Sequence, residues 1–216
     1  MEYGLVGATG KMGKEVVTAF KEHQLVLAIN SKGEQLFGTP KVVIDFSSAG
    51  ALSRTLEVCA RHKAALVVGT TALREDDFAA LRKYAADAPV VQSYNFATGV
   101  NVLKMILRDY APLFDGWDLE ITETHHNKKK DAPSGTAVLL RDATGRDCPT
   151  HSLRLGGVPG DHAVSFANEG EVVTFSHRAI ARNVYAIGAL RAALFAVSAK
   201  AGFYTFEDVL KQNRQI

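Results

Sequence analysis

The chain contains little cysteine. Of its 216 residues only Cys59 and Cys148 are cysteines, and they lie too far apart in the sequence to form a Cys-x-x-Cys pair. Two lone cysteines in a chain of this size are typical of buried thiols in a reducing compartment. We therefore expect a cytoplasmic protein, and no metal site is predicted.

The chain also has neither a large net charge nor a long apolar segment. The net charge is only +2, and the basic run at residues 128–130 is too short for a nucleic-acid-binding tail. The N-terminus lacks a basic region followed by an apolar core, which argues against a signal peptide. The most apolar late stretch, residues 185–199, is interrupted by Arg191 and is too short to span a bilayer. We expect neither a nucleic-acid partner nor a membrane.

Apolar runs alternate with helical patterns through the first half of the chain. Such strands, separated by helices, indicate a parallel sheet that is covered on both faces. Only residues 30–41 join the second strand to the third, which is too short for a usual helical crossover, so we expect a loop there. Ser47 and Ser48 are placed to cap the helix that follows the third strand. The expected strands are residues 2–6, 25–29, 42–46, 65–69 and 90–94, with helices at 14–21, 49–62 and 73–86.

A glycine-rich turn follows the first strand. Gly7, Gly10 and Gly13 stand between that strand and the first helix, which is the context of a dinucleotide-binding fingerprint. The spacing alone could be an ordinary tight turn. The phosphate loop of nucleoside triphosphatases is excluded, because Glu15 follows the Gly-Lys pair and Ala8 stands where the first glycine is needed. Ligands of parallel sheets bind at the carboxyl ends of the strands, and this turn falls at such an end.

The second half changes character. A helix is expected at residues 101–113, followed by alternating polar and apolar strands and by a returning helix at 183–199. We predict an α/β fold. It combines a Rossmann-like dinucleotide-binding domain, residues 1–97 and 183–216, with a smaller α+β domain, residues 98–182, that contains a mixed sheet. The strands of that sheet are expected at residues 117–123, 152–155, 163–167 and 171–177.

Residues 123–137 bring together the reactive side chains of the second half. His125 and His126 supply imidazoles that titrate near neutrality, and the lysines at 128–130 attract carboxylates. Residues 131–136 read as a loop that turns into a helix, and the free N–H groups of a helix start bind anions. The segment therefore indicates a small acidic substrate that takes up a proton.

The motifs resemble those of the 4-hydroxy-tetrahydrodipicolinate reductase family, also called dihydrodipicolinate reductases. The resemblance covers nearly the whole chain. It implies NADPH- or NADH-dependent reduction of that dicarboxylate to tetrahydrodipicolinate, with loss of water, in diaminopimelate and lysine biosynthesis. It also implies a homotetramer built by the second, substrate-binding and oligomerisation domain. The matching segments are residues 7–13, 45–47, 69–71, 95–96, 99–101, 123–137, 154–162 and 177–179.

The resemblance also implies the site residues. His125 is the expected proton donor and Lys129 its partner. The expected substrate contacts are His126, Ser134, Gly135, Thr136 and, as a further carboxylate contact, Arg182. The expected cofactor contacts are Gly7, Ala8, Thr9, Gly10, Lys11, Met12, Gly69, Thr70, Thr71, Ser93, Tyr94, Asn95 and Phe96.

The end of the second strand predicts the cofactor preference. An acid usually stands there in NAD-selective sites, whereas this strand ends in Asn30, Ser31 and Lys32, with Glu34 only later. Lys32 is therefore included among the cofactor contacts, and we expect both cofactors to work, with NADPH moderately favoured. The chain is short for the family in this region. Ala72 replaces a glycine that often follows the Gly-Thr-Thr run, a change expected to matter little.

Alternatives remain open at this point. The chain could be another nicotinamide-dependent reductase of a small keto or imino acid, or a cofactor sensor without turnover. The two histidines could be ordinary surface residues, Ser134 and Thr136 could serve only as helix caps, and Asp45 could cap a turn. Glu123 is expected to be a structural partner rather than an acid.

Overall fold

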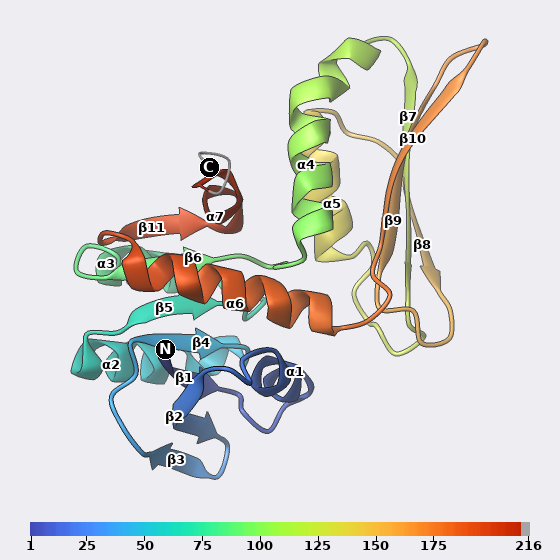
Figure 1. Ribbon diagram of the computed structural model, residues 1–216. Coiled ribbons are helices and arrows are strands. Elements are labelled where there is room, and N and C mark those ends of the chain that lie inside the picture. The colour runs from blue at the N-terminus through green and yellow to red at the C-terminus, as the bar shows by residue number, and fades with distance from the viewer. Residues whose placement is uncertain (213–216) are drawn as a thin grey trace. The chain divides into compact units, whose positions relative to one another are not determined.

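The structure, a computed structural model, describes residues 1–212. The chain divides into two compact units, residues 1–96 with 183 onward and residues 97–182 (Figure 1). The last four residues of the predicted first domain, 213–216, lie outside the described residues. The first unit contains β1 (Glu2–Val6), α1 (Lys11–Ala19), β2 (Gln24–Asn30), β3 (Gly33–Leu36), β4 (Val42–Asp45), a 3-10 turn (Ala49–Ala51), α2 (Leu52–His62), β5 (Ala65–Val68), α3 (Glu75–Tyr84), β6 (Pro89–Gln92), α6 (Asn183–Ser198), β11 (Gly202–Thr205) and α7 (Phe206–Gln212). The second contains α4 (Thr98–Tyr110), a 3-10 turn (Ala111–Phe114), β7 (Asp118–His125), α5 (Gly135–Thr144), β8 (Thr150–Arg154), β9 (Asp161–Ala167) and β10 (Val172–Arg178).

The first unit is built on a seven-stranded sheet within the described residues. Its order is β11-β6-β5-β4-β1-β2-β3, and every neighbouring pair is parallel except β2 and β3. One apolar cluster joins this sheet to α1 and α6, and a second joins it to α2 and α3. The predicted parallel sheet with both faces covered is therefore confirmed. No helix within residues 1–212 is both long and apolar enough to cross a membrane.

The link between β2 and β4 contains a strand that the sequence did not predict. Asn30 pairs with Gly33 and Ile29 with Glu34, so β3 returns antiparallel along β2. The Asn30 side chain accepts a hydrogen bond of 2.8 Å from the Lys32 amide and so stabilises the turn. Because the link is too short for a crossover, the chain adds an edge hairpin instead. The hairpin also places an acid, Glu34, opposite the end of β2, where the sequence indicated none.

One further expectation about this unit was wrong, and two short elements were missed. Ser48 stands at the N-cap of the 3-10 turn, but its side chain makes no capping hydrogen bond. β11 and α7 were not predicted, because β11 has only four residues and pairs with β6, far away in sequence. The Asp208 side chain accepts hydrogen bonds from the amide and hydroxyl of Thr205 and so secures the start of α7.

Ala72 adopts a left-handed backbone conformation, with φ of 61°. A side chain makes this conformation unfavourable, and glycine avoids that penalty but loses more entropy on folding. We expect Ala72→Gly to raise the free energy of unfolding by about 0.5–1 kcal/mol, measured by urea denaturation. Lys63→Gly is the matched control, because Lys63 has φ of 52° at the end of α2 and should gain similarly. A loss of stability in Ala72→Gly alone would contradict the conformation of Ala72.

The second unit has a four-stranded mixed sheet, as predicted. Its order is β10-β9-β7-β8, with β7 and β8 parallel and the other pairs antiparallel. β7 alternates exposed and buried residues, and its buried side includes Leu119 and Ile121. Helix α4 packs against β10 and α5 against β7. The rings of Phe114 and Phe166 stack with centroids 4.4 Å apart.

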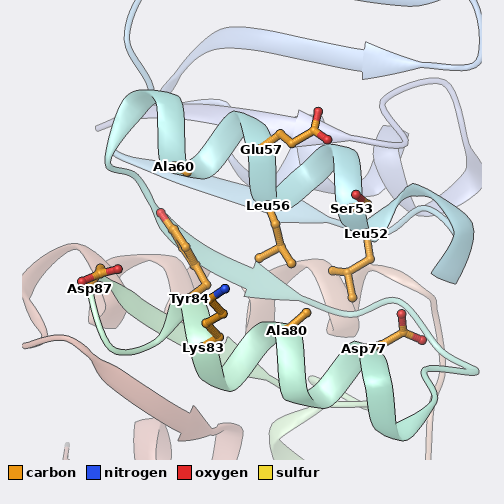
Figure 2. Close-up of a pocket in the computed structure, with 10 residues that line it drawn as sticks. All are labelled: Leu52, Ser53, Leu56, Glu57, Ala60, Asp77, Ala80, Lys83, Tyr84 and Asp87. Atoms are coloured by element: carbon orange, nitrogen blue, oxygen red, sulfur yellow. The ribbon is translucent and has the colours of Figure 1, made fainter.

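A groove of about 430 Å³ opens between α2 and α3 in the first unit (Figure 2). Apolar side chains, among them Leu52 and Leu56, line it, and Glu57, Asp77 and Lys83 stand around it. None of the residues lining it belongs to the predicted cofactor or substrate sets.

Candidate active site

The glycine turn after β1 has the geometry of a phosphate-binding loop. Gly7 has φ of 85°, and a Cβ there would lie 2.6 Å from the Phe46 carbonyl oxygen. At Gly13 a Cβ would lie 2.3 Å from the Gly7 carbonyl oxygen, so the start of α1 can pack on the turn only without a side chain. Gly10, at the N-cap of α1, offers no side chain to the first amides of the helix. These amides and the helix dipole are suited to a pyrophosphate, so the turn fits a dinucleotide.

Asp45 organises the neighbouring strand ends. It is completely buried, and its carboxylate accepts hydrogen bonds from Ser47 and from the hydroxyls of Thr55 and Thr70. Its role is wider than the turn cap considered from the sequence, because it joins the ends of β4 and β5 to α2. The Thr70 hydroxyl, a predicted cofactor contact, is thus already committed to this carboxylate.

The other predicted cofactor residues differ in exposure. Phe96 is buried in the core, and the centroid of its ring lies 5.1 Å from that of Phe206. The Ser93 hydroxyl donates to the Asn95 carbonyl over 2.8 Å. Ala8 and Met12 pack partly against the core. The exposed members of the set are Thr9, Gly10, Lys11, Lys32, Thr71 and Tyr94.

In the second unit, Glu123 joins the residues of the central motif. Its side chain is completely buried, on β7. Its carboxylate is bound by both terminal nitrogens of Arg154, at 3.0 and 2.8 Å, and by Nδ1 of His125. It also accepts from the amide of Ser134 over 3.2 Å. One carboxylate therefore fixes an imidazole, a guanidinium and the start of α5, which agrees with the predicted structural role of Glu123.

The ionisation of this cluster follows from its contacts. Burial alone would raise the pKa of the Glu123 carboxyl, but hydrogen bonds from Arg154, Ser152 and His125 outweigh burial and lower this pKa to about 2. Burial lowers the pKa of His125, the contact with Glu123 opposes this shift, and the charges of Lys129 and Arg154 add to it. Glu123 is therefore an anion near neutral pH, and His125 is poised to gain a proton when negative charge arrives.

The other ring nitrogen of His125, Nε2, lies beside Gly160. A Cβ at Gly160 would lie 3.0 Å from His125 Nε2, so glycine at this position leaves space at that nitrogen. With Nδ1 held by Glu123, Nε2 is the atom that can exchange a proton with a ligand. Lys129, three-quarters buried or more, pairs with Asp131 over 2.7 Å, and its charge acts on His125.

Ser134 caps α5, as the sequence indicated. Its hydroxyl accepts a hydrogen bond of 3.2 Å from the Ala137 amide and shares another, of 3.1 Å, with Nε2 of His162. Because Ser134 is buried and its amide is bound to Glu123, it fixes the start of α5 from the buried side. Gly135, the first residue of α5, is exposed.

His162 makes the stability of the protein depend on pH. Burial first, and then the nearby His125, lower the pKa of His162 from 6.5 to about 3. The folded protein thus keeps it neutral while the unfolded chain binds a proton, so stability is lost as pH falls below 6.5. We expect His162→Gln to reduce the slope of unfolding free energy against pH by up to about 1.4 kcal/mol per pH unit.

The measurement is urea denaturation between pH 6.5 and about 5.5, above the pH near 4.5 at which Glu123 takes up its proton in the unfolded chain. His125 and His177 also have lowered pKa values, so part of the slope remains in the variant. His151→Gln, at an exposed histidine of β8, is the control for the replacement of a surface imidazole by an amide. An unchanged slope in His162→Gln would show that His162 is not held neutral by the fold.

Sequence reasoning left two members of the cluster without a role. Arg154 and His162 belong to the matching segments, but nothing local marks them as neighbours of Glu123. The strand register does so, because Arg154 lies opposite His125 and His162 opposite Glu123. His126 is half-buried, one residue past β7. Arg182, the last residue of this unit, has no hydrogen bond or ion pair to the cluster within residues 1–212.

An open parallel sheet with this glycine turn is typical of dinucleotide-binding oxidoreductases, and the buried carboxylate–imidazole pair supplies an acid–base group. Two family models cover the chain: "Dihydrodipicolinate reductase, N-terminus" matches residues 1–96 and "Dihydrodipicolinate reductase, C-terminus" residues 99–210. The chain belongs to the dihydrodipicolinate reductase family, so the predicted family and the predicted class of oxidoreductase are confirmed.

Individual relatives agree. The 4-hydroxy-tetrahydrodipicolinate reductase of Thermosipho africanus is 48% identical over 214 residues, which cover 98% of this chain and 99% of the relative. That of Zymomonas mobilis is 39% identical over 246 residues, covering 97% of each chain. A dipicolinate-bound dihydrodipicolinate reductase from Paenisporosarcina sp. TG-14 has the same fold, with a TM-score of 0.81, 21% identity and coverage of 96% and 98%. The predicted fold is confirmed by this match.

Proposed function

We propose that the chain catalyses the reduction of 4-hydroxy-tetrahydrodipicolinate to tetrahydrodipicolinate, with NADPH or NADH, in lysine and diaminopimelate biosynthesis. The substrate loses water and gains a hydride and a proton. The glycine turn and the start of α1 hold the pyrophosphate of the cofactor. The bound nicotinamide supplies the hydride.

The residues of the second unit hold the dicarboxylate and move the proton. Lys129 and the N-terminus of α5, at Gly135 and Thr136, attract carboxylates, with His126 and Arg182 as further contacts. A bound dianion raises the pKa of His125, and the imidazolium then gives its Nε2 proton to the substrate. Glu123 keeps the ring oriented through Nδ1 and stabilises its positive charge. Ser134 acts from within the fold, where it fixes the helix start.

The observation that carries this proposal is the shared carboxylate of Glu123. It binds both the His125 ring and the Ser134 amide at the start of α5. Acid catalysis and anion binding are thereby fixed to one point, which suits a substrate whose carboxylate lies close to the atom that is protonated. A keto-acid reductase would need an acid but not this attachment to a helix start, and a cofactor sensor would need neither.

The test is NAD(P)H oxidation with freshly generated product of dihydrodipicolinate synthase, followed by absorbance. We expect turnover with this compound and none with pyruvate or oxaloacetate. Turnover of the keto acids alone would favour the alternative reductase. Cofactor binding without turnover of any of them would favour the sensor.

We further propose a homotetramer in the cytoplasm. On β10, alternate residues are exposed on the side of the sheet away from α4, including Val172 at 67% exposure, and this surface is available to another copy. Light scattering should give four chains per particle at micromolar concentrations, and a monomer would contradict the assembly. The cytoplasmic location is supported by the two free thiols, of which Cys59 is buried with a raised pKa.

A further inference from the structure

The β2–β3 hairpin places an acid at the end of β2. Asn30 faces Gly33 and Ile29 faces Glu34, so Glu34 stands one pair from the strand end although it follows four residues later. In dinucleotide-binding folds the 2′ position of the adenosine ribose is recognised at this end of the strand. An acid there binds the 2′-hydroxyl of NAD, whereas an arginine binds the 2′-phosphate of NADP. Which of these applies depends on the partners of Glu34.

Both oxygens of the Glu34 carboxylate are bound by arginines of α2. Arg54 Nη2 lies 2.6 Å from Oε2, and Arg61 Nη1 lies 3.3 Å from Oε1. The Glu34 side chain is only 16% exposed, whereas those of Arg54 and Arg61 are 54% and 53% exposed. The negative charge of the carboxylate is thus balanced by the two guanidinium groups, and both of its oxygens already have partners. This cluster of three side chains keeps an excess positive charge on its solvent side and is suited to a phosphate rather than to a hydroxyl pair.

The two arginines differ in their position relative to the ligand-binding edge of the sheet. α2 follows β4 and leads to the parallel strand β5, so it starts at the carboxyl edge and runs away from it. Arg54 lies in the first turn of α2 and Arg61 in the last, about 10 Å further along the axis. Only Arg54 is therefore close to the edge at which the cofactor binds.

We infer that Arg54 is a specificity-determining residue that recognises the adenosine 2′-phosphate of NADPH, with Glu34 holding its guanidinium in place. This inference rests on the proposed function and adds a residue to it. Lys32, exposed at the tip of the hairpin, contributes a mobile charge. The guanidinium of Arg54, in contrast, is held in place by the Glu34 carboxylate. Glu34 thus acts as a positioning residue for Arg54, and its charge no longer opposes the phosphate.

The test measures binding without turnover, by calorimetry on the full chain. The probes are adenosine 2′,5′-bisphosphate and adenosine 5′-monophosphate, which differ only in the 2′-phosphate. In Arg54→Gln we expect the dissociation constant of the bisphosphate to rise about tenfold or more, with that of the monophosphate nearly unchanged. Arg54→Lys should lose less, because it keeps the charge. The wild-type preference for the bisphosphate should decrease at high salt.

Arg61→Gln is the matched control, because it removes the other guanidinium from the same carboxylate at nearly the same exposure. It should leave the dissociation constant of the monophosphate unchanged and raise that of the bisphosphate far less than Arg54→Gln does, because Arg61 lies at the far end of α2. Thermal denaturation should show similar stability in the two glutamine variants. Equal weakening of both probes in Arg54→Gln, or equal effects of Arg54→Gln and Arg61→Gln, would overturn the inference. Wild-type turnover would then still support the proposed function, whereas wild-type protein that binds neither NADPH nor NADH would refute both.

Discussion

Replacing His125 with glutamine is expected to lower kcat by about 10²–10⁴-fold, the usual contribution of a general acid. Glutamine can still bind Glu123 but cannot carry the proton, so the fold of the motif is kept while the proton step is lost. Steady-state kinetics with saturating cofactor measure the effect. The dissociation constant of the cofactor should be unchanged, because the proposed cofactor contacts belong to the other unit of the chain.

The control is His151→Gln, since His151 is an exposed histidine of the same unit whose side chain pairs with the surface residue Glu120. Its kcat should match that of the wild-type protein. If His125→Gln kept a kcat near that of the wild type, the proton donor would have to be sought elsewhere. Lys129→Ala should also lower kcat, because Lys129 adds to the positive charge around the substrate.

Replacing Glu123 with alanine is expected to lower the free energy of unfolding by about 3–5 kcal/mol, because a largely buried guanidinium then loses its carboxylate. The same change removes the partners of His125 and of the Ser134 amide. Urea denaturation near neutral pH measures the loss. The stability that Glu123 contributes is present above pH 4.5 and is lost as pH falls toward its folded pKa of about 2.

Glu120→Ala is the matched control. Glu120 lies three residues earlier on β7, but its side chain is 59% exposed and pairs with His151 at the surface. Exposed pairs contribute about 0–1 kcal/mol, so this variant should remain close to the wild type. Similar losses in the two variants would show that Glu123 does not organise the motif.

The local part of the site could be predicted from the sequence. The turn at Gly7 follows from a strand, spaced glycines and a helix within a dozen residues. Ser134 was placed at the start of a helix by the residues around it, and its capping hydrogen bond to Ala137 is present. Such signals depend on neighbours in the chain, which a single sequence displays.

The remainder depends on pairing between distant segments. Arg154 is 31 residues from Glu123 in the sequence, and His162 is 28 residues from Ser134. Their contacts arise from the register of β7 with β8 and β9, which the sequence pattern does not determine. The hairpin at Glu34 was not predicted for a related reason. The short link between the second and third predicted strands excludes a helical crossover, but it does not indicate that the chain turns back and pairs with β2.

The most direct test of the proposed reaction uses NADPH that carries deuterium at both hydrogens of C4. With freshly generated 4-hydroxy-tetrahydrodipicolinate, mass spectrometry should find one deuterium in each molecule of tetrahydrodipicolinate formed and one cofactor oxidised per product. Cofactor oxidation without label in this product, or label found only in a reduced keto acid, would contradict the account.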